Sequence, residues 1–107
     1  MSVKRLVSKL TKENLWIYIL TELSRKPLYA YEIAKTLKNK YEIPVATVTT
    51  YVVLYKMSRE GLITKKEESS PEKPERKYYV ITEKGLNALN EGKKFLHKTL
   101  DLLEKQT

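Results

Sequence analysis

The sequence contains no cysteine, one histidine and three glycines, and it has no long apolar run. Without cysteine there can be no disulfides, thiolate metal sites or cysteine nucleophiles. The glycines at 61, 85 and 92 are too dispersed to form a phosphate-binding loop or a dinucleotide fingerprint. The longest apolar run, residues 15–20, is far shorter than the roughly 20 residues that span a bilayer. We therefore expect a cytoplasmic protein with no membrane partner.

The scarcity of reactive side chains also argues against catalysis. His97 has only Asp101 as a nearby aspartate, and the sequence offers no nucleophile to combine with them. A lone histidine is more often a surface or packing residue than a catalytic one. We predict that the chain is not an enzyme and that it holds no metal or cofactor.

Positive charge is what the sequence has in excess. Lysine and arginine total 21 against 13 acidic residues, which gives a net charge of +8 and a pI near 9.6. Residues 1–40 carry nine basic and three acidic side chains, whereas residues 41–80 carry seven and six. Such an excess favours polyanions, with nucleic acid as the first candidate, although a basic surface that serves only solubility is the alternative.

The 107 residues fit one domain, and apolar periodicity divides them into helices and a hairpin. Residues 3–10 predict a short helix or an arm. Residues 13–23, 29–39 and 47–60 predict three helices, the third with Thr47 as N-cap and Gly61 as its stop. Residues 62–67 and 77–81 predict two paired strands around a polar tip. A last helix begins after Thr82 and continues to the end with a heptad-like stripe of leucines.

Three short helices followed by a hairpin is the order of a winged helix-turn-helix. We predict a mostly α fold with a small β-hairpin wing (α+β) and an added C-terminal dimerisation helix. Residues 1–81 would form the DNA-binding part, and residues 82–107 would form the dimerisation helix of the same compact unit.

Four segments carry a resemblance to a known family. They are LYAYEI at residues 28–33, YVVLYKM at 51–57, EGLI at 60–63 and RKYYVITEKG at 76–85. With these segments, residues 13–90 resemble the PadR family of transcriptional regulators, although Ala30 and Val52 replace a glycine and a proline often found there. The resemblance implies a transcriptional repressor that binds double-stranded DNA as a homodimer paired through the last and first helices. In several members of the family, small aromatic effectors release the protein from DNA.

The third helix is the expected recognition helix. Val48, Tyr51, Leu54, Tyr55 and Met57 are predicted to face the core. The opposite face would meet DNA, because hydroxyls, methyl groups and ammonium groups suit base edges and phosphates. An ordinary solvated helix face is the alternative. The predicted DNA-binding residues of this helix are Thr47, Thr49, Thr50, Val53 and Lys56.

The wing is expected to add phosphate contacts that position the protein without reading sequence. A hairpin whose lysines only protect an exposed sheet edge is the alternative. Tyr78 and Tyr79 should point to opposite faces, one of them into the core. The candidate phosphate-binding residues are Lys65, Lys66, Lys73, Arg76 and Lys77.

Two further sites follow from apolar residues. The leucine stripe of the last helix predicts dimerisation through Leu89, Leu96, Leu100 and Leu103, with packing onto the protein's own first helix as the alternative. Trp16 is a candidate wall of a pocket for a small aromatic effector, although it would pack on its helix stripe in any case.

The sequence thus predicts a sequence-specific, dimeric DNA-binding regulator. Two other functions remain open: a winged-helix protein-interaction module, and a non-specific nucleoid or RNA binder.

Overall fold

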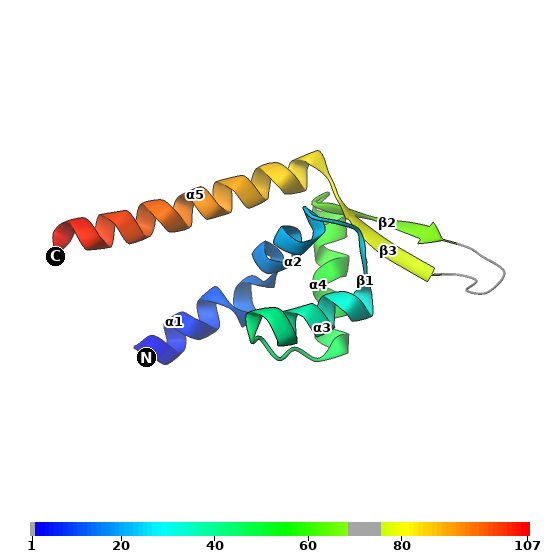
Figure 1. Cartoon of the computed structure of the whole chain (residues 1–107), viewed down its shortest axis with the longest axis horizontal. Helices are drawn as coiled ribbons and strands as arrows, with labels where there is room; N and C mark the ends of the chain where they lie inside the picture. The colour runs from blue at the N-terminus through cyan, green and yellow to red at the C-terminus, as the bar shows by residue number, and fades with distance from the viewer. Residues whose placement is uncertain (1, 69–75) are drawn as a thin grey trace.

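The computed structural model describes residues 2–68 and 76–107 and arranges them as a winged helix with two projecting helices (Figure 1). The elements in chain order are α1 (Val3–Leu10), a 3-10 turn (Lys12–Asn14), α2 (Leu15–Leu23), β1 (Leu28–Tyr29), α3 (Ala30–Tyr41), α4 (Thr47–Arg59), β2 (Ile63–Glu68), β3 (Arg76–Ile81) and α5 (Glu83–Gln106). The predicted mostly α winged helix-turn-helix with a C-terminal helix is confirmed.

Local signals set the helix ends. Gly61 has a φ of 79°, and the Leu62 N–H donates to the Met57 carbonyl at 3.0 Å, which closes α4 with a Schellman motif. Thr82 caps α5 as predicted, because its hydroxyl accepts from the Gly85 N–H at 3.0 Å. The predicted N-cap of α4 is off by one residue: Ala46 occupies that position, and Thr47 is the first helical residue.

The sheet has three antiparallel strands in the order β1-β3-β2, with the wing formed by β2 and β3. Leu28 pairs with Tyr79 and Tyr29 with Tyr78. Tyr29 therefore belongs to β1, whereas its prediction as part of the second helix is wrong. A strand of two residues shows no alternation, so the sequence alone could not distinguish it from the start of α3.

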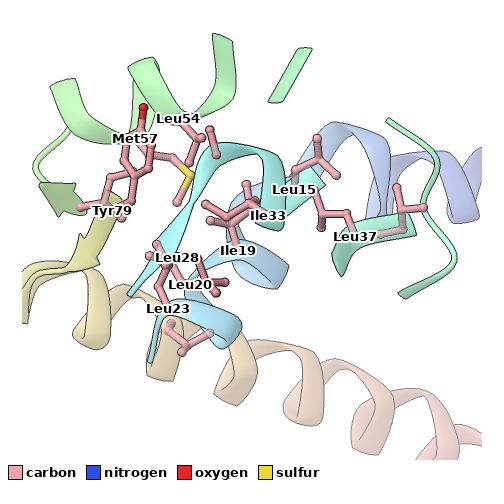
Figure 2. Packing of buried hydrophobic residues seen from close by; sticks show 14 residues of the cluster. Leu15, Ile19, Leu20, Leu23, Leu28, Ile33, Leu37, Leu54, Met57 and Tyr79 are labelled. Carbon is pink, nitrogen blue, oxygen red and sulfur yellow. The ribbon is translucent and has the colours of Figure 1, made fainter. Parts of the chain in front are cut away.

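The core lies where α2, α3, α4 and the sheet meet (Figure 2). Ile19 and Leu20 of α2 and Leu54 of α4 are fully buried there, and Tyr79 closes the core from the sheet. The sheet face that carries Tyr79 therefore packs against the helices, while Tyr78 on the other face is only half-buried, as the alternation predicts. The core fixes α4 and β2 side by side.

Helices α1 and α5 extend away from this core, on the side opposite the wing (Figure 1). None of the residues of α1 is buried, and α5 buries only Gly85 and Leu89. Within the described residues, no helix combines the length and apolar character needed to cross a membrane.

Candidate nucleic-acid interface

The exposed face of α4 is the first part of the candidate interface. Val48, which is 73% exposed, and Tyr55, which is 62% exposed, project from this face with Tyr51 and Val52. Thr49 and Lys56 are exposed as predicted, and so is Thr47. The prediction that Val48, Tyr51 and Tyr55 face the core is wrong, since the helix is rotated about its axis relative to the prediction.

Thr50 marks the error most clearly. It is predicted to face DNA, yet its exposed fraction is 0%. Its hydroxyl donates to the Ala46 carbonyl at 3.3 Å, so the buried side chain is satisfied within the helix. Val53 is also partly buried against the core and not outward as predicted. A threonine that bonds its own helix packs like a small apolar residue, whereas a tyrosine tolerates exposure through its hydroxyl.

The second part is a groove between α4 and β2, which we call the wing groove. It encloses about 620 Å³, and its floor includes the buried Ile63 and Tyr79. The other lining residues are polar or aromatic. They are Tyr51, Tyr55, Ser58 and Arg59 from α4, and Thr64 and Lys65 from β2.

Burial raises the pKa of Tyr79 above its ordinary value of 10.0, and the neighbouring Tyr51 raises it further. The Tyr79 hydroxyl therefore stays protonated at neutral pH and adds no negative charge to the groove floor. Two cationic side chains, Arg59 and Lys65, line the groove, and no acidic side chain is among its lining residues within the described part of the chain. The wing groove thus presents positive charge and hydroxyls to an incoming anion.

Strand register separates the wing cations that the sequence groups together. Lys65 lies opposite Tyr79 and Lys66 opposite Tyr78, so the two lysines occupy opposite faces of the sheet. Lys77 lies 3.9 Å from Glu67, its pairing partner across the strands. Arg76 is placed in β3 by its backbone alone, and Lys73 lies outside the described residues. Of Lys65, Lys66 and Lys77, whose side chains the structure describes, only Lys65 lines the wing groove.

The leucines predicted to mediate dimerisation fall into two groups. Leu89 is 1% exposed and belongs to the core of its own chain, so its assignment to an interface between chains is wrong. Its helix position meets α2 because Gly92, one turn later, allows α5 to approach Trp16 closely. Leu96, Leu100 and Leu103 are exposed.

Trp16 lines a cleft between the projecting helices and the body, which we call the tryptophan cleft. The cleft encloses about 480 Å³. Its lining is mainly aromatic and aliphatic, with Asn14, Thr21 and the charged Lys93 as polar members. The Trp16 indole N–H donates to the Asn14 side chain at 3.1 Å. The remaining lining residues are Leu10, Ile17, Tyr18, Tyr41, Gly92, Phe95 and Leu96.

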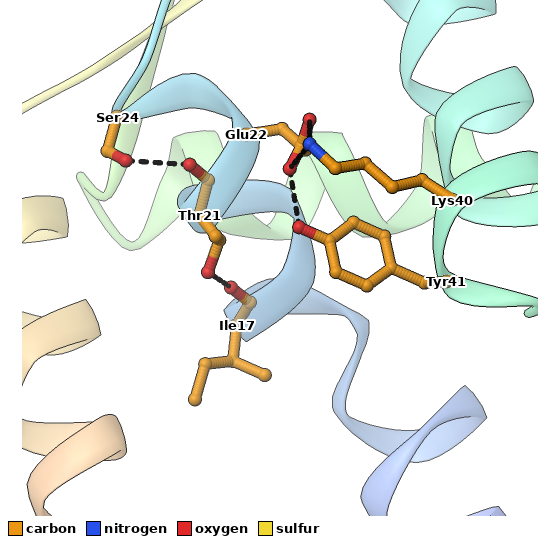
Figure 3. A network of polar contacts seen from close by, with 6 residues as sticks. All are labelled: Ile17, Thr21, Glu22, Ser24, Lys40 and Tyr41. Carbon is orange, nitrogen blue, oxygen red and sulfur yellow. Dashed lines mark hydrogen bonds and ion pairs between the residues drawn. The ribbon is translucent and has the colours of Figure 1, made fainter.

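A polar network connects this cleft to α3 (Figure 3). The Tyr41 hydroxyl donates to the Glu22 carboxylate, and the Lys40 ammonium lies 3.1 Å from it. Burial and the bond to Glu22 raise the pKa of Tyr41 to about 12. Burial alone would raise the pKa of Glu22, but the bonds from Tyr41 and Lys40 outweigh it and lower the pKa. These bonds connect Tyr41, a cleft residue of α3, with Glu22 of α2.

Other chemistry is scarce on the part of the chain that the structure describes. No group of three or more histidine, cysteine, aspartate or glutamate side chains there could hold a metal ion. The pattern of the sequence could not reveal Val48, Tyr51, Val52, Tyr55 and Arg59 as surface residues of the interface. A signal that the sequence does offer is the hydroxyl group of Tyr51 and Tyr55, which allows these side chains to be exposed to water.

Comparison with known proteins agrees with this geometry. The model of the transcriptional regulator PadR-like family matches residues 19–91. No curated protein sequence matches the chain significantly.

Several solved structures share the fold. A PadR family transcriptional regulator from Eggerthella lenta DSM 2243 is 31% identical, with a TM-score of 0.79, 96% of this chain and 89% of that chain covered. A PadR-like transcriptional regulator from Bacillus cereus strain ATCC 14579 is 32% identical, with a TM-score of 0.75 and coverages of 92% and 95%. PadR of Bacillus subtilis, solved in complex with operator DNA, is 28% identical, with a TM-score of 0.65 and coverages of 72% and 44%.

The match of the family model over most of the chain, together with relatives above 30% identity along nearly its whole length, identifies the chain as a member of the PadR-like family of transcriptional regulators.

Proposed function

We propose that this regulator is a cytoplasmic homodimer that binds double-stranded DNA in a sequence-specific manner and represses transcription by occluding a promoter. The observation that carries the proposal is the outward face of α4 beside a groove lined by Arg59 and Lys65. A helix with this placement fits the major groove, where side chains reach base edges. The Bacillus subtilis PadR, which was solved with operator DNA, supports the same use of the fold.

Base reading is assigned to the residues that α4 exposes. The methyl groups of Val48 and Val52 fit the thymine methyl, and the Thr49 hydroxyl and Lys56 ammonium fit acceptors on base edges or phosphates. Thr47 lies in the first turn, where side chains commonly meet the backbone of DNA. Thr50 and Val53 take no part in this assignment because they face the core.

Dimerisation is assigned to the exposed apolar residues of α5 and α1. Leu96, Leu100 and Leu103 form a stripe on α5, and α1 exposes Val3, Leu6, Val7 and Leu10. Apolar surface of this extent is unfavourable in water, and a second copy would cover it. A two-fold dimer would present two α4 helices to two half-sites.

A direct test is a fluorescence-anisotropy titration with duplex DNA from upstream of the protein's own gene, at near-physiological salt and with excess random duplex. Binding that survives the competitor supports a specific regulator. Binding that the competitor abolishes favours a non-specific nucleoid binder, and absence of binding favours a protein-interaction module.

The tryptophan cleft is proposed as the effector site. Its volume of about 480 Å³ lies in the range of small-molecule pockets, and its walls are largely aromatic. Because Trp16 is the only tryptophan, its fluorescence reports on this cleft alone. Titration with small aromatic compounds should quench that emission and lower DNA affinity. Unchanged emission with these ligands would remove them as effectors.

A further inference from the structure

The turn between α3 and α4 has a backbone conformation that needs support. Glu42, which ends α3, has a φ of 58°, in the left-handed region that favours glycine. The Ile43 N–H donates to the Leu37 carbonyl at 2.9 Å, and α4 begins shortly afterwards at Thr47. A residue with a Cβ keeps a left-handed conformation only where its surroundings restrain it. The contacts made by the last turn of α3 therefore help to determine where α4 begins.

Glu22 of α2 holds this last turn from outside α3 (Figure 3). Its carboxylate accepts a hydrogen bond from the Tyr41 hydroxyl and lies 3.1 Å from the Lys40 ammonium. The Glu22 side chain is largely shielded from water, which strengthens such charge-assisted bonds. Ile19 and Leu20, which precede Glu22 on α2, are fully buried, so the carboxylate is carried by a helix that the core fixes.

The Tyr41 ring makes a second contact with α2. It meets the ring of Tyr18 edge-on, with the ring centres 5.2 Å apart and the planes at 69°. The two half-buried tyrosines differ in the partner of the hydroxyl. Tyr18 donates to the Leu10 carbonyl of α1, whereas Tyr41 donates to Glu22 and is the residue directly before the left-handed turn. Removal of each hydroxyl therefore separates the restraint on the turn from the packing of the two rings.

We propose that Tyr41 is a positioning residue for DNA binding, because its bond to Glu22 fixes the turn that leads into α4. This inference rests on the proposed function and adds to it a residue outside the outward face of α4. The first turn of α4 carries Thr47, Val48 and Thr49, which lie nearest this turn and are exposed. Base-edge hydrogen bonds require close placement of donor and acceptor, whereas attraction to phosphates declines gradually with distance. A loosened turn should therefore reduce specificity more than it reduces affinity for DNA in general.

The test compares Tyr41→Phe, which removes the hydroxyl and keeps the ring, with Tyr18→Phe as the matched control. Each variant is titrated at near-physiological salt with the duplex from upstream of the gene and with a random-sequence duplex. Thermal melts and sedimentation establish that each variant is folded and has the oligomeric state of the unmodified protein. Lys40→Ala removes the other partner of Glu22 from a half-exposed position, so it decides the question if Tyr41→Phe does not fold.

Tyr41→Phe should bind the upstream duplex about tenfold more weakly and the random duplex less than about twofold more weakly. Tyr18→Phe should keep the ratio of the two affinities. Lys40→Ala should lower this ratio by about twofold to threefold, and Lys40→Arg should restore it. If Tyr41 only stabilises the fold, its variant melts at a lower temperature while the ratio of affinities is unchanged, and that result overturns the proposal.

Hydrogen exchange measures the turn itself. The Ile43 N–H belongs to the turn, and the Thr50 N–H donates to the Ala46 carbonyl at 3.1 Å at the start of α4. Tyr41→Phe should speed the exchange of these two amides about tenfold through local opening. The amides of the buried face of α2 should change no more than in the control variant. Equal acceleration in α2 and in the turn would indicate a global loss of stability and would overturn the restraint.

The outcomes distinguish this inference from the proposed function. If the unmodified protein shows no preference for the upstream duplex, sequence-specific regulation fails. Selective acceleration at Ile43 and Thr50 would then still support the restraint on the turn, and unchanged exchange would overturn it. If the preference is present and Tyr41→Phe retains it, the proposed function stands and the positioning role of Tyr41 fails.

Discussion

Two adjacent threonines of α4 occupy opposite environments. Thr49 is exposed on the outward face, whereas Thr50 is fully buried and bonded to the Ala46 carbonyl. The same residue type therefore serves two purposes one position apart: a polar group available to a ligand, and a small side chain that fills the core. The pair provides an internal control for the proposed interface.

Thr50→Ala should lower the free energy of unfolding by about 1 kcal/mol, because it removes a buried methyl group and a satisfied hydroxyl. Its preference for the specific duplex over random duplex should be unchanged. Thr49→Ala should leave stability within about 0.5 kcal/mol and reduce that preference by about 1 to 3 kcal/mol if its hydroxyl reads a base. Chemical denaturation and anisotropy measure the two effects. If Thr49→Ala lowered stability and Thr50→Ala lowered the preference for the specific duplex, Thr50 and not Thr49 would be on the outward face of α4.

Glu22 links stability to pH. Its side chain is 13% exposed, and the bonds from Tyr41 and Lys40 bring the pKa of Glu22 below its usual value of 4.5 although burial opposes them. A carboxylate with a lowered pKa stabilises the folded state above its unfolded-state pKa, and this contribution disappears as pH falls through the folded-state pKa. The fold should therefore lose stability from about pH 5 downward.

Glu22→Gln should lower the free energy of unfolding at pH 7 by about 1 kcal/mol and flatten its decline on acidification. Glu13→Gln is the control, because the hydrogen bond from Lys9 also lowers the pKa of Glu13 but both side chains are about half exposed. An exposed pair contributes little. Denaturation curves between pH 3 and 7 measure the free energy of unfolding. If this free energy falls as steeply with decreasing pH in Glu22→Gln as in the unmodified protein, Glu22 does not link stability to pH.

At the scale of elements, the sequence predicted the helices well and the orientation of α4 poorly. Helix ends carry chemical signals, such as Gly61 and Thr82, that act locally and are visible in the sequence. The orientation of α4 depends on which apolar residues the rest of the fold accepts. Valine and tyrosine count as apolar in a periodic pattern, yet Val48 and Tyr55 face outward. Only the tertiary arrangement of α2, α3 and the sheet determines the face that α4 buries.

The start of α5 is fixed by a close approach of two backbones. A Cβ added at Gly85 would lie 2.1 Å from the Leu62 carbonyl oxygen, whereas one added at Gly92 would meet the end of the Trp16 ring at 2.9 Å. The Thr82 hydroxyl also donates to the Gly61 carbonyl at 2.6 Å, so the turn after α4 and the cap of α5 form one junction. Backbone cannot move aside as a side chain can.

Gly85→Ala should therefore destabilise the fold by about 2 to 3 kcal/mol, even though alanine is the better helix former. Gly92→Ala should cost about 1 kcal/mol or less, since the ring of Trp16 can shift and helix propensity offsets part of the strain. Thermal unfolding compares the two directly. Equal effects would show that the close approach of Gly85 to the Leu62 carbonyl oxygen does not constrain the start of α5.

At the scale of the whole molecule, one chain does not enclose its own apolar surface. The radius of gyration is 15.7 Å, against about 13 Å for a compact domain of about 100 residues. Both α1 and the second half of α5 contribute to the excess, because they extend away from the core (Figure 1). The leucine stripe in the sequence predicted self-association, but it could not reveal that the stripe divides. Leu89 completes the chain's own core, and the leucines beyond Gly92 remain exposed.

This division leads to different outcomes for leucines on one helix. Leu100 is 55% exposed, so Leu100→Glu should leave the melting temperature of the monomeric fold unchanged while it places two charges in a two-fold apolar interface. Two lost leucines at about 1.5 kcal/mol each correspond to a dimer at least about 100-fold weaker.

Two variants of the same helix serve as controls. Lys98→Glu, a charge change at another exposed position, should remain dimeric. Leu89→Glu should instead prevent folding, because its position is inside the core. Sedimentation equilibrium with circular dichroism distinguishes these outcomes. A Leu100→Glu variant that stays dimeric would exclude this stripe as the interface, and the two α4 helices would then have to be paired by another surface.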